Sequence, residues 1–152
     1  MPKLIIFAAC EKVIIDRAQI PSLIGIFQGL NIQLTGEPMP EKAVTPMRWA
    51  IFTCWQHDPE EKGTEFTQYM EVVTPSGEYF IKGETKFKVT EDNDLQGKIV
   101  YDLNSIPVHE EGFFTVRVWY DGAPESKAEY KFFLKHLPFV PDVQTPSSIL
   151  VS

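Results

Sequence analysis

The sequence predicts an all-β protein folded as a two-sheet antiparallel sandwich of the immunoglobulin-like type. Residues 112–120 and 129–134 alternate polar and apolar side chains around a short loop that contains Asp121 and Gly122, which is the pattern of antiparallel strands with one buried face. About eight such segments follow one another at short spacing with turn residues between them, as in a sandwich. No segment carries a capped period of 3.6 residues, so helices are not expected. A β-barrel or a jelly roll is the alternative architecture.

The N-terminal segment, residues 3–10, is almost continuously apolar, which predicts a strand at the centre of a sheet. Residues 13–15 extend this strand beyond a bend. Residues 22–35 form the next predicted strand. Gly25 and Gly29 fall in its first half, where a glycine marks a bulge or a close approach of another backbone.

The middle of the chain continues the strand pattern. Residues 36–46 are rich in proline and charge, and we expect them to cross from one sheet to the other. Residues 47–56 carry large apolar side chains on both faces, which predicts a strand covered on both sides. Residues 65–74 and 79–89 predict a hairpin, because the turn between them, residues 75–78, has proline and glycine at favourable positions.

A shorter strand over residues 97–103 leads through 106–108 into the terminal hairpin. We predict one domain over residues 1–137, because 152 residues are too few for two comfortable cores. Residues 138–152 contain three prolines and little periodicity, so they are predicted to be a tail. Its last apolar residues, 149–151, are expected to pack on the body of the protein or on a partner.

The charge of the chain argues against polyanionic partners. The net charge is −7, and residues 57–111 alone hold 13 acidic and 5 basic side chains. No local cluster of Lys and Arg is visible along the sequence. We therefore expect the protein to bind neither nucleic acid nor an anionic membrane surface.

Two cysteines, Cys10 and Cys54, are too few for a domain held together by disulfides. Small residues precede Cys10 as in a lipoprotein cleavage site, but the stretch before it is shorter than a signal peptide requires. No run of apolar residues is long enough to cross a membrane. These features predict a cytoplasmic protein with reduced thiols.

The sequence lacks the motifs of catalysis, so we expect no enzyme, no cofactor and no metal. None of the three histidines, His57, His109 and His136, has the surroundings of a nucleophile and its base. Cys54, His57 and Asp58 lie close together but lack the further ligands of a zinc site. There is also no glycine-rich loop of the kind that cradles phosphates.

The C-terminal hairpin carries the candidate partner-contact residues. Because side chains alternate along a strand, Trp119 faces away from the core if its neighbour Val118 faces inward. Phe113 and Arg117 then lie on the same outward face, and Phe133 joins them from the returning strand. Such a face is more apolar than a solvated sheet face. It is therefore either covered within the chain or forms the contact with a protein partner or a second copy of the chain.

The alternative function is the binding of a carbohydrate or another small ligand. Trp49, Trp55 and His57 fall on or just beyond one predicted strand and are the candidate lining of such a pocket, because sugars stack on tryptophan rings. A concave aromatic pocket favours this alternative, whereas a flat apolar face favours a protein partner.

Several phrases of the chain together resemble a family of functionally uncharacterised bacterial β-sandwich proteins of about this length. The resemblance covers nearly the whole chain to Leu137. It implies a small sandwich domain in bacteria and brings no known activity or catalytic residue. The phrases that carry it are residues 4–10 (Leu-Ile-Ile-Phe-Ala-Ala-Cys), 22–27 (Ser-Leu-Ile-Gly-Ile-Phe), 74–77 (Thr-Pro-Ser-Gly), 112–116 (Gly-Phe-Phe-Thr-Val) and 120–122 (Tyr-Asp-Gly).

Overall fold

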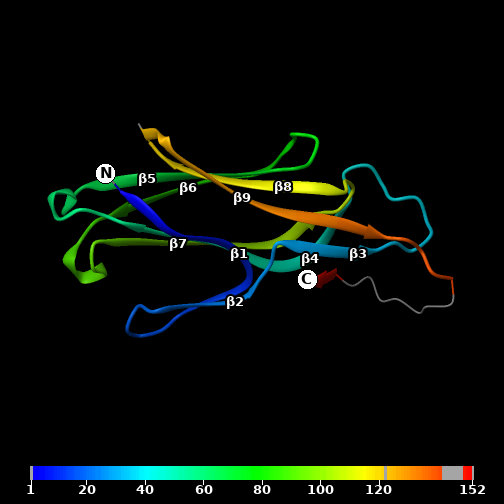
Figure 1. Cartoon of the computed structure of the whole chain (residues 1–152), viewed down its shortest axis with the longest axis horizontal. Helices are drawn as coiled ribbons and strands as arrows, with labels where there is room; N and C mark the ends of the chain where they lie inside the picture. Colours follow the sequence, from blue (N-terminus) through cyan, green and yellow to red (C-terminus); the bar gives the residue numbers. More distant parts are fainter. Residues whose placement is uncertain (1, 122, 142–148, 152) are drawn as a thin grey trace.

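The computed structural model describes residues 2–121, 123–141 and 149–151, and these form two stacked β-sheets (Figure 1). Sheet A contains, in spatial order, β2 (Pro21–Ile26), β1 (Lys3–Ile15), β4 (Val44–Gln56) and β7 (Gln96–Pro107). Sheet B contains β10 (Ile149–Val151), β3 (Gly29–Gln33), β9 (Ala123–Leu137), β8 (Gly112–Tyr120), β5 (Glu65–Val73) and β6 (Tyr79–Lys88). The predicted two-sheet sandwich is confirmed, and its immunoglobulin-like type stays a prediction.

The only helices in the described part of the chain are two single 3₁₀ turns, η1 (Pro59–Glu61) and η2 (Glu91–Asn93). No described helix is long and apolar enough to cross a membrane. Cys10 and Cys54 are both buried and free. Burial is the main cause that raises the pKa of each thiol, so both behave as small apolar core groups.

The position of β1 agrees with its sequence, because this apolar strand lies between β2 and β4 in the interior of sheet A. All pairs of described strands are antiparallel except one. β3 runs parallel to β9, with Leu30 opposite Leu134 and Ile32 opposite His136. The predicted antiparallel sandwich therefore contains one parallel pair of strands.

The predicted strand over residues 22–35 is wrong, because the chain changes sheets in its middle. The N–H of Phe27 donates to the carbonyl of Ala9 in sheet A at 3.1 Å, and the next carbonyl, of Gln28, accepts from the N–H of Phe133 in sheet B at 2.8 Å. Phe27 itself is fully buried. The break between β2 and β3 thus places one large ring in the core. The sequence did not reveal this break, because apolar residues continue on either side of it.

Other boundaries follow the sequence more closely. The connection before β4 crosses from sheet B to sheet A as predicted, although β4 starts at Val44. β7 continues unbroken through the predicted gap at residues 104–105. The backbone of β10 pairs with β3 and so adds residues 149–151 to sheet B. The remainder of the predicted tail beyond Pro141, residues 142–148 and 152, lies outside the described residues.

The hydrophobic core lies between the two sheets and is rich in aromatic rings. The ring of Phe132 meets those of Phe27 and Trp49 edge to face, with centroids 5.3 and 5.7 Å away. Phe114 stacks on the same ring at 5.2 Å. Such contacts add to the stability gained from burial alone.

A buried amide joins the two sheets inside the sandwich. Gln68 of β5 is fully buried, and its Oε1 accepts hydrogen bonds from Thr53 Oγ1 and Trp55 Nε1 of β4. Its Nε2 donates to the hydroxyl of Tyr101 on β7. The Gln68 network therefore fixes which side of β5 faces sheet A.

We expect Gln68→Leu to lower the free energy of unfolding by about 2–4 kcal/mol, because it leaves the Trp55 indole N–H and the Thr53 hydroxyl buried without partners. Urea unfolding followed by fluorescence measures this. Thr115→Val is the control, since Thr115 lies away from the core, and its effect should stay within about 0.5 kcal/mol. A Gln68→Leu protein as stable as the wild type would contradict the structural role of the network.

Candidate functional site

The outer face of sheet B is the side that points away from sheet A. Its side chains alternate with core residues along each strand, and the register places them side by side. The outer face consists of Lys82, Glu84, Lys86 and Lys88 on β6; Glu65, Thr67, Tyr69 and Glu71 on β5; Phe113, Thr115, Arg117 and Trp119 on β8; and Lys127, Glu129, Lys131, Phe133 and Lys135 on β9.

The charge of the outer face differs in sign from that of the whole protein. It holds seven of the 14 Lys and Arg residues and four of the 21 Asp and Glu residues, a balance of +3. The net charge of −7 then leaves −10 on the rest of the chain. No basic cluster is visible along the sequence, because the lysines come from β6 and β9, which are far apart in the sequence and flank β5 and β8 in the sheet.

Aromatic rings occupy the two central strands of this face. Tyr69 and Trp119 lie opposite each other and stack at 5.7 Å with an angle of 25°. The ammonium of Lys127 lies 4.5 Å from the centre of the Trp119 ring. At the other end, Phe113 meets Phe133 edge to face at 5.1 Å and remains 58% exposed. Each pair is thus an apolar contact point beside positive charge.

Arg117 links three strands at the middle of the outer face. Its Nε donates to Glu129 of β9 at 2.9 Å, and its Nη1 donates to Glu71 of β5 at 3.3 Å. The hydrogen bond with Glu129 is the largest cause that raises the pKa of Arg117. The guanidinium therefore holds the face together, and its polar edge is already engaged.

All four residues that we predicted as partner contacts, Phe113, Arg117, Trp119 and Phe133, lie on the outer face. Phe113 is exposed and the other three are half-buried. Their direction away from the core follows from the alternation of side chains. Their contact with a partner stays a prediction.

The predicted ligand pocket takes a different form in the structure. Trp49 and Trp55 are each 1% exposed and His57 is 2% exposed, so all three belong to the core. Trp49 and Trp55 lie six residues apart on one strand, about 20 Å. Large rings on the inner face of a sandwich are buried by the opposite sheet. The alternation of side chains in the sequence does not distinguish such buried rings from rings that line an open pocket.

A cavity of about 280 Å³ does open elsewhere, beside β3 and the connection that leads to β4. Ile32, Met39 and Val108 are among its lining residues, and none of those residues is aromatic. It therefore lacks the stacking surface that the carbohydrate alternative requires.

His57 forms part of an aromatic cluster at the start of the loop after β4. Its Nε2 is 3.1 Å from the hydroxyl of Tyr120, and its ring lies 4.7 Å from that of Phe66. Burial lowers the pKa of His57 below its ordinary value, although Glu61 opposes the shift. The imidazole is therefore a neutral core group at physiological pH.

A second surface with exposed apolar side chains lies on the β1–β2 hairpin and was not foreseen. β2 is an edge strand of sheet A, and natural proteins usually protect such edges with charge. Its exposed isoleucines include Ile14, Ile20, Ile24 and Ile26. The exposed charges near it, Glu11, Lys12, Asp16 and Arg17, balance one another, whereas the outer face of sheet B has a positive balance.

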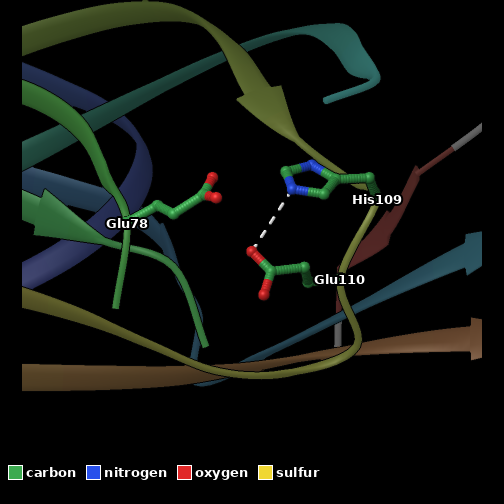
Figure 2. A group of neighbouring side chains, drawn as sticks. All are labelled: Glu78, His109 and Glu110. Atoms are coloured by element: carbon green, nitrogen blue, oxygen red, sulfur yellow. Dashed lines mark ion pairs between the residues drawn. The ribbon is translucent and has the colours of Figure 1, made fainter. Parts of the chain in front are cut away.

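A third feature is a cluster of ionisable groups at one end of the sandwich, formed by Glu78, His109 and Glu110 (Figure 2). One ligand atom from each residue lies within 4.8 Å of the others. The Nε2 of His109 is 3.3 Å from Oε2 of Glu110. Of these residues the sequence singled out only His109, because the approach of the two loops depends on the pairing of β5 with β8.

The fold and its surfaces define a small two-sheet β-sandwich with an aromatic, positively charged face. A family model matches residues 5–132 and describes a family of unknown function, DUF6941. The chain therefore belongs to this family, which confirms the resemblance to an uncharacterised family; its bacterial origin stays a prediction. No curated protein matches the chain.

We expect His57→Phe to reduce the sensitivity of the protein to mild acid. Below its ordinary pKa of about 6.5, an unfolded His57 binds a proton that the folded residue does not bind, so wild-type stability falls as the pH drops. Phenylalanine removes this contribution, which amounts to at most about 1.4 kcal/mol per pH unit. Unfolding free energies at about pH 7.5 and about pH 5.5 measure it. Equal pH dependence in variant and wild type would contradict the prediction.

Proposed function

We propose that the protein is a non-catalytic interaction module that binds an acidic surface of a separate protein through the outer face of sheet B. The observation that carries this proposal is the balance of +3 on a face of a protein whose net charge is −7. Complementary charge raises the rate of encounter and selects partners of opposite sign.

The aromatic pairs supply the contact energy that charge alone does not give. Tyrosine, tryptophan and arginine are the residues most enriched at the energetic centres of interfaces. Tyr69 and Trp119 adjoin Arg117 on neighbouring positions of β5 and β8, and Lys127 covers part of the Trp119 ring. A partner that presents carboxylates around an apolar patch matches this arrangement.

Three features favour an acidic protein over nucleic acid as the partner. The rest of the chain carries −10, which repels an extended polyanion. Arg117, the arginine of this face, already donates to two carboxylates, which leaves fewer of its donors for a phosphate. The Tyr69 and Trp119 rings stack on each other, so they are not open platforms for bases.

The proposal places the module in the cytoplasm and assigns it no cofactor. Both cysteines are free, as is usual in reducing compartments. The neutral, buried His57 sits among aromatic rings rather than beside a nucleophile.

The test is a selection of 12-residue peptides from a random displayed library against the whole protein. We expect enriched peptides to combine Asp or Glu with apolar residues, and their affinity to fall when salt is raised. Trp119→Ala, or the double change Lys131→Glu with Lys135→Glu, should weaken binding at least about tenfold, because a hot-spot ring or four units of charge are lost.

The matched control is Arg17→Glu with Lys42→Glu, which makes the same change in net charge at two exposed turn residues away from the outer face. Equal loss of binding in both double variants, or selection of peptides without acidic residues, would contradict the proposal. Binding of a 20-residue oligo(dT) that depends on Lys131 would assign the face to nucleic acid instead. A dimer seen by light scattering that Trp119→Glu dissociates and Ile24→Glu leaves intact would assign it to a second copy.

A further inference from the structure

Two loops meet closely at the end of the sandwich that carries Glu78, His109 and Glu110. The β5–β6 turn supplies Glu78, and the loop between β7 and β8 supplies the other two residues. Gly112 makes the approach feasible, since its φ is +137° and a Cβ there would lie 3.0 Å from Pro75. A residue with a side chain at this position would push the two loops apart.

Hydrogen bonds fix the backbone of both loops. In the turn, the N–H of Thr74 donates to the carbonyl of Glu78 at 2.8 Å. In the other loop, the carbonyl of Val108 accepts from Nε2 of His136 at 2.7 Å, and Glu111 accepts from the N–H of the same histidine. The three ionisable side chains therefore extend from anchored backbone, which is what a preformed binding site requires.

Two atoms of the cluster are buried and lack hydrogen-bond partners among the described residues. They are Oε2 of Glu110 and Nδ1 of His109, on side chains that are 20% and 17% exposed. Oε2 of Glu110 faces Nε2 of His109 without forming a hydrogen bond to it. Buried polar atoms are almost always paired, so this oxygen, whose contact here is the ion pair with His109, can accept a further positive ligand.

Burial alone would raise the pKa of Glu110, but the hydroxyls of Ser76 and Thr74 and the neighbouring His109 lower it below its ordinary value. Figure 2 shows the carboxylate of Glu78 directed from the opposite loop toward the same space as His109 and Glu110. Two negative groups and an imidazole nitrogen thus converge.

We propose that Glu78, His109 and Glu110 bind a divalent transition metal ion of the Zn²⁺ class. Ligands at about 2.0–2.1 Å in tetrahedral geometry are about 3.3 Å apart, and the observed spacing of His109 Nε2 and Glu110 Oε2 is 3.3 Å. One imidazole with two carboxylates suits Zn²⁺, whereas Mg²⁺ and Ca²⁺ prefer oxygen ligands only. Three protein ligands leave the fourth position for water or for a partner's side chain.

The competing interpretation is a plain ion pair between protonated His109 and Glu110. The two differ in what each residue contributes. An ion pair does not need Glu78 and holds a proton, whereas a metal site needs all three residues and neutral imidazole.

The test is a titration of the whole, chelator-treated protein with Zn²⁺ against a chromophoric competitor. We expect one ion per chain, and affinity lowered at least about tenfold in each of His109→Ala, Glu110→Gln and Glu78→Gln, because each change removes a ligand. Zn²⁺ should raise the melting temperature of the wild type and not of Glu110→Gln. Asp92→Asn, in the acidic η2 turn, is the matched control and should bind like the wild type.

A measurement on the wild-type protein tests the site even if the variants fail to fold. Mn²⁺ added in small amounts should broaden amide NMR signals of residues 74–78 and 108–111 before any others. Broadening that starts at η1 or η2, or Zn²⁺ binding that survives the loss of His109, would overturn the site. Equal Zn²⁺ affinity in Glu78→Gln and wild type would exclude Glu78 as a ligand and overturn the three-residue site.

Discussion

The structure depends on the buried amide of Gln68. It accepts hydrogen bonds from Thr53 and Trp55 in the opposite sheet and so forms a polar link inside a mostly apolar core. Because side chains alternate along a strand, a shift of β5 by one residue would bring Tyr69 and Glu71 into the core and expose their neighbours. A buried polar group that is fully paired in only one arrangement selects that arrangement over its alternatives. The hydrogen bonds of Gln68 thus determine both the register of β5 and which of its side chains lie on the outer face.

The same strand connects the two candidate sites. Tyr69 and Glu71 lie on the outer face, and β5 ends at Val73, immediately before the turn that bears Glu78. β8 pairs with β5 and follows the loop of His109 and Glu110, so it links both sites as well. The outer face and the ionisable cluster are therefore rigidly related. A partner bound to the face near Phe113 would lie beside the end of the sandwich at which the cluster sits, because Phe113 is the second residue of β8.

Local patterns predicted the strands, most of the turns and the outward direction of Phe113, Arg117, Trp119 and Phe133. They failed where two distant segments decide the outcome. The switch of sheets at Phe27 is fixed by two hydrogen bonds. The N–H of Phe27 donates to the carbonyl of Ala9, and the N–H of Phe133 donates to the carbonyl of Gln28. No residue nearby in the sequence signals this switch. Trp49, Trp55 and His57 are buried by the opposite sheet, which alternation does not reveal. The lysines of β6 and β9, and Glu78 with His109, become neighbours only through the strand order.

The central claim is that the outer face of sheet B recognises acidic protein surface. Chemical-shift mapping of the ¹⁵N-labelled whole chain with a peptide of ten glutamates at low salt tests it most directly. The account predicts that shifts concentrate at Tyr69, Trp119, Lys131 and their neighbours on β5, β8, β9 and β6, and that they disappear at high salt. Shifts centred on the β1–β2 hairpin, or no shifts at low salt, would contradict it.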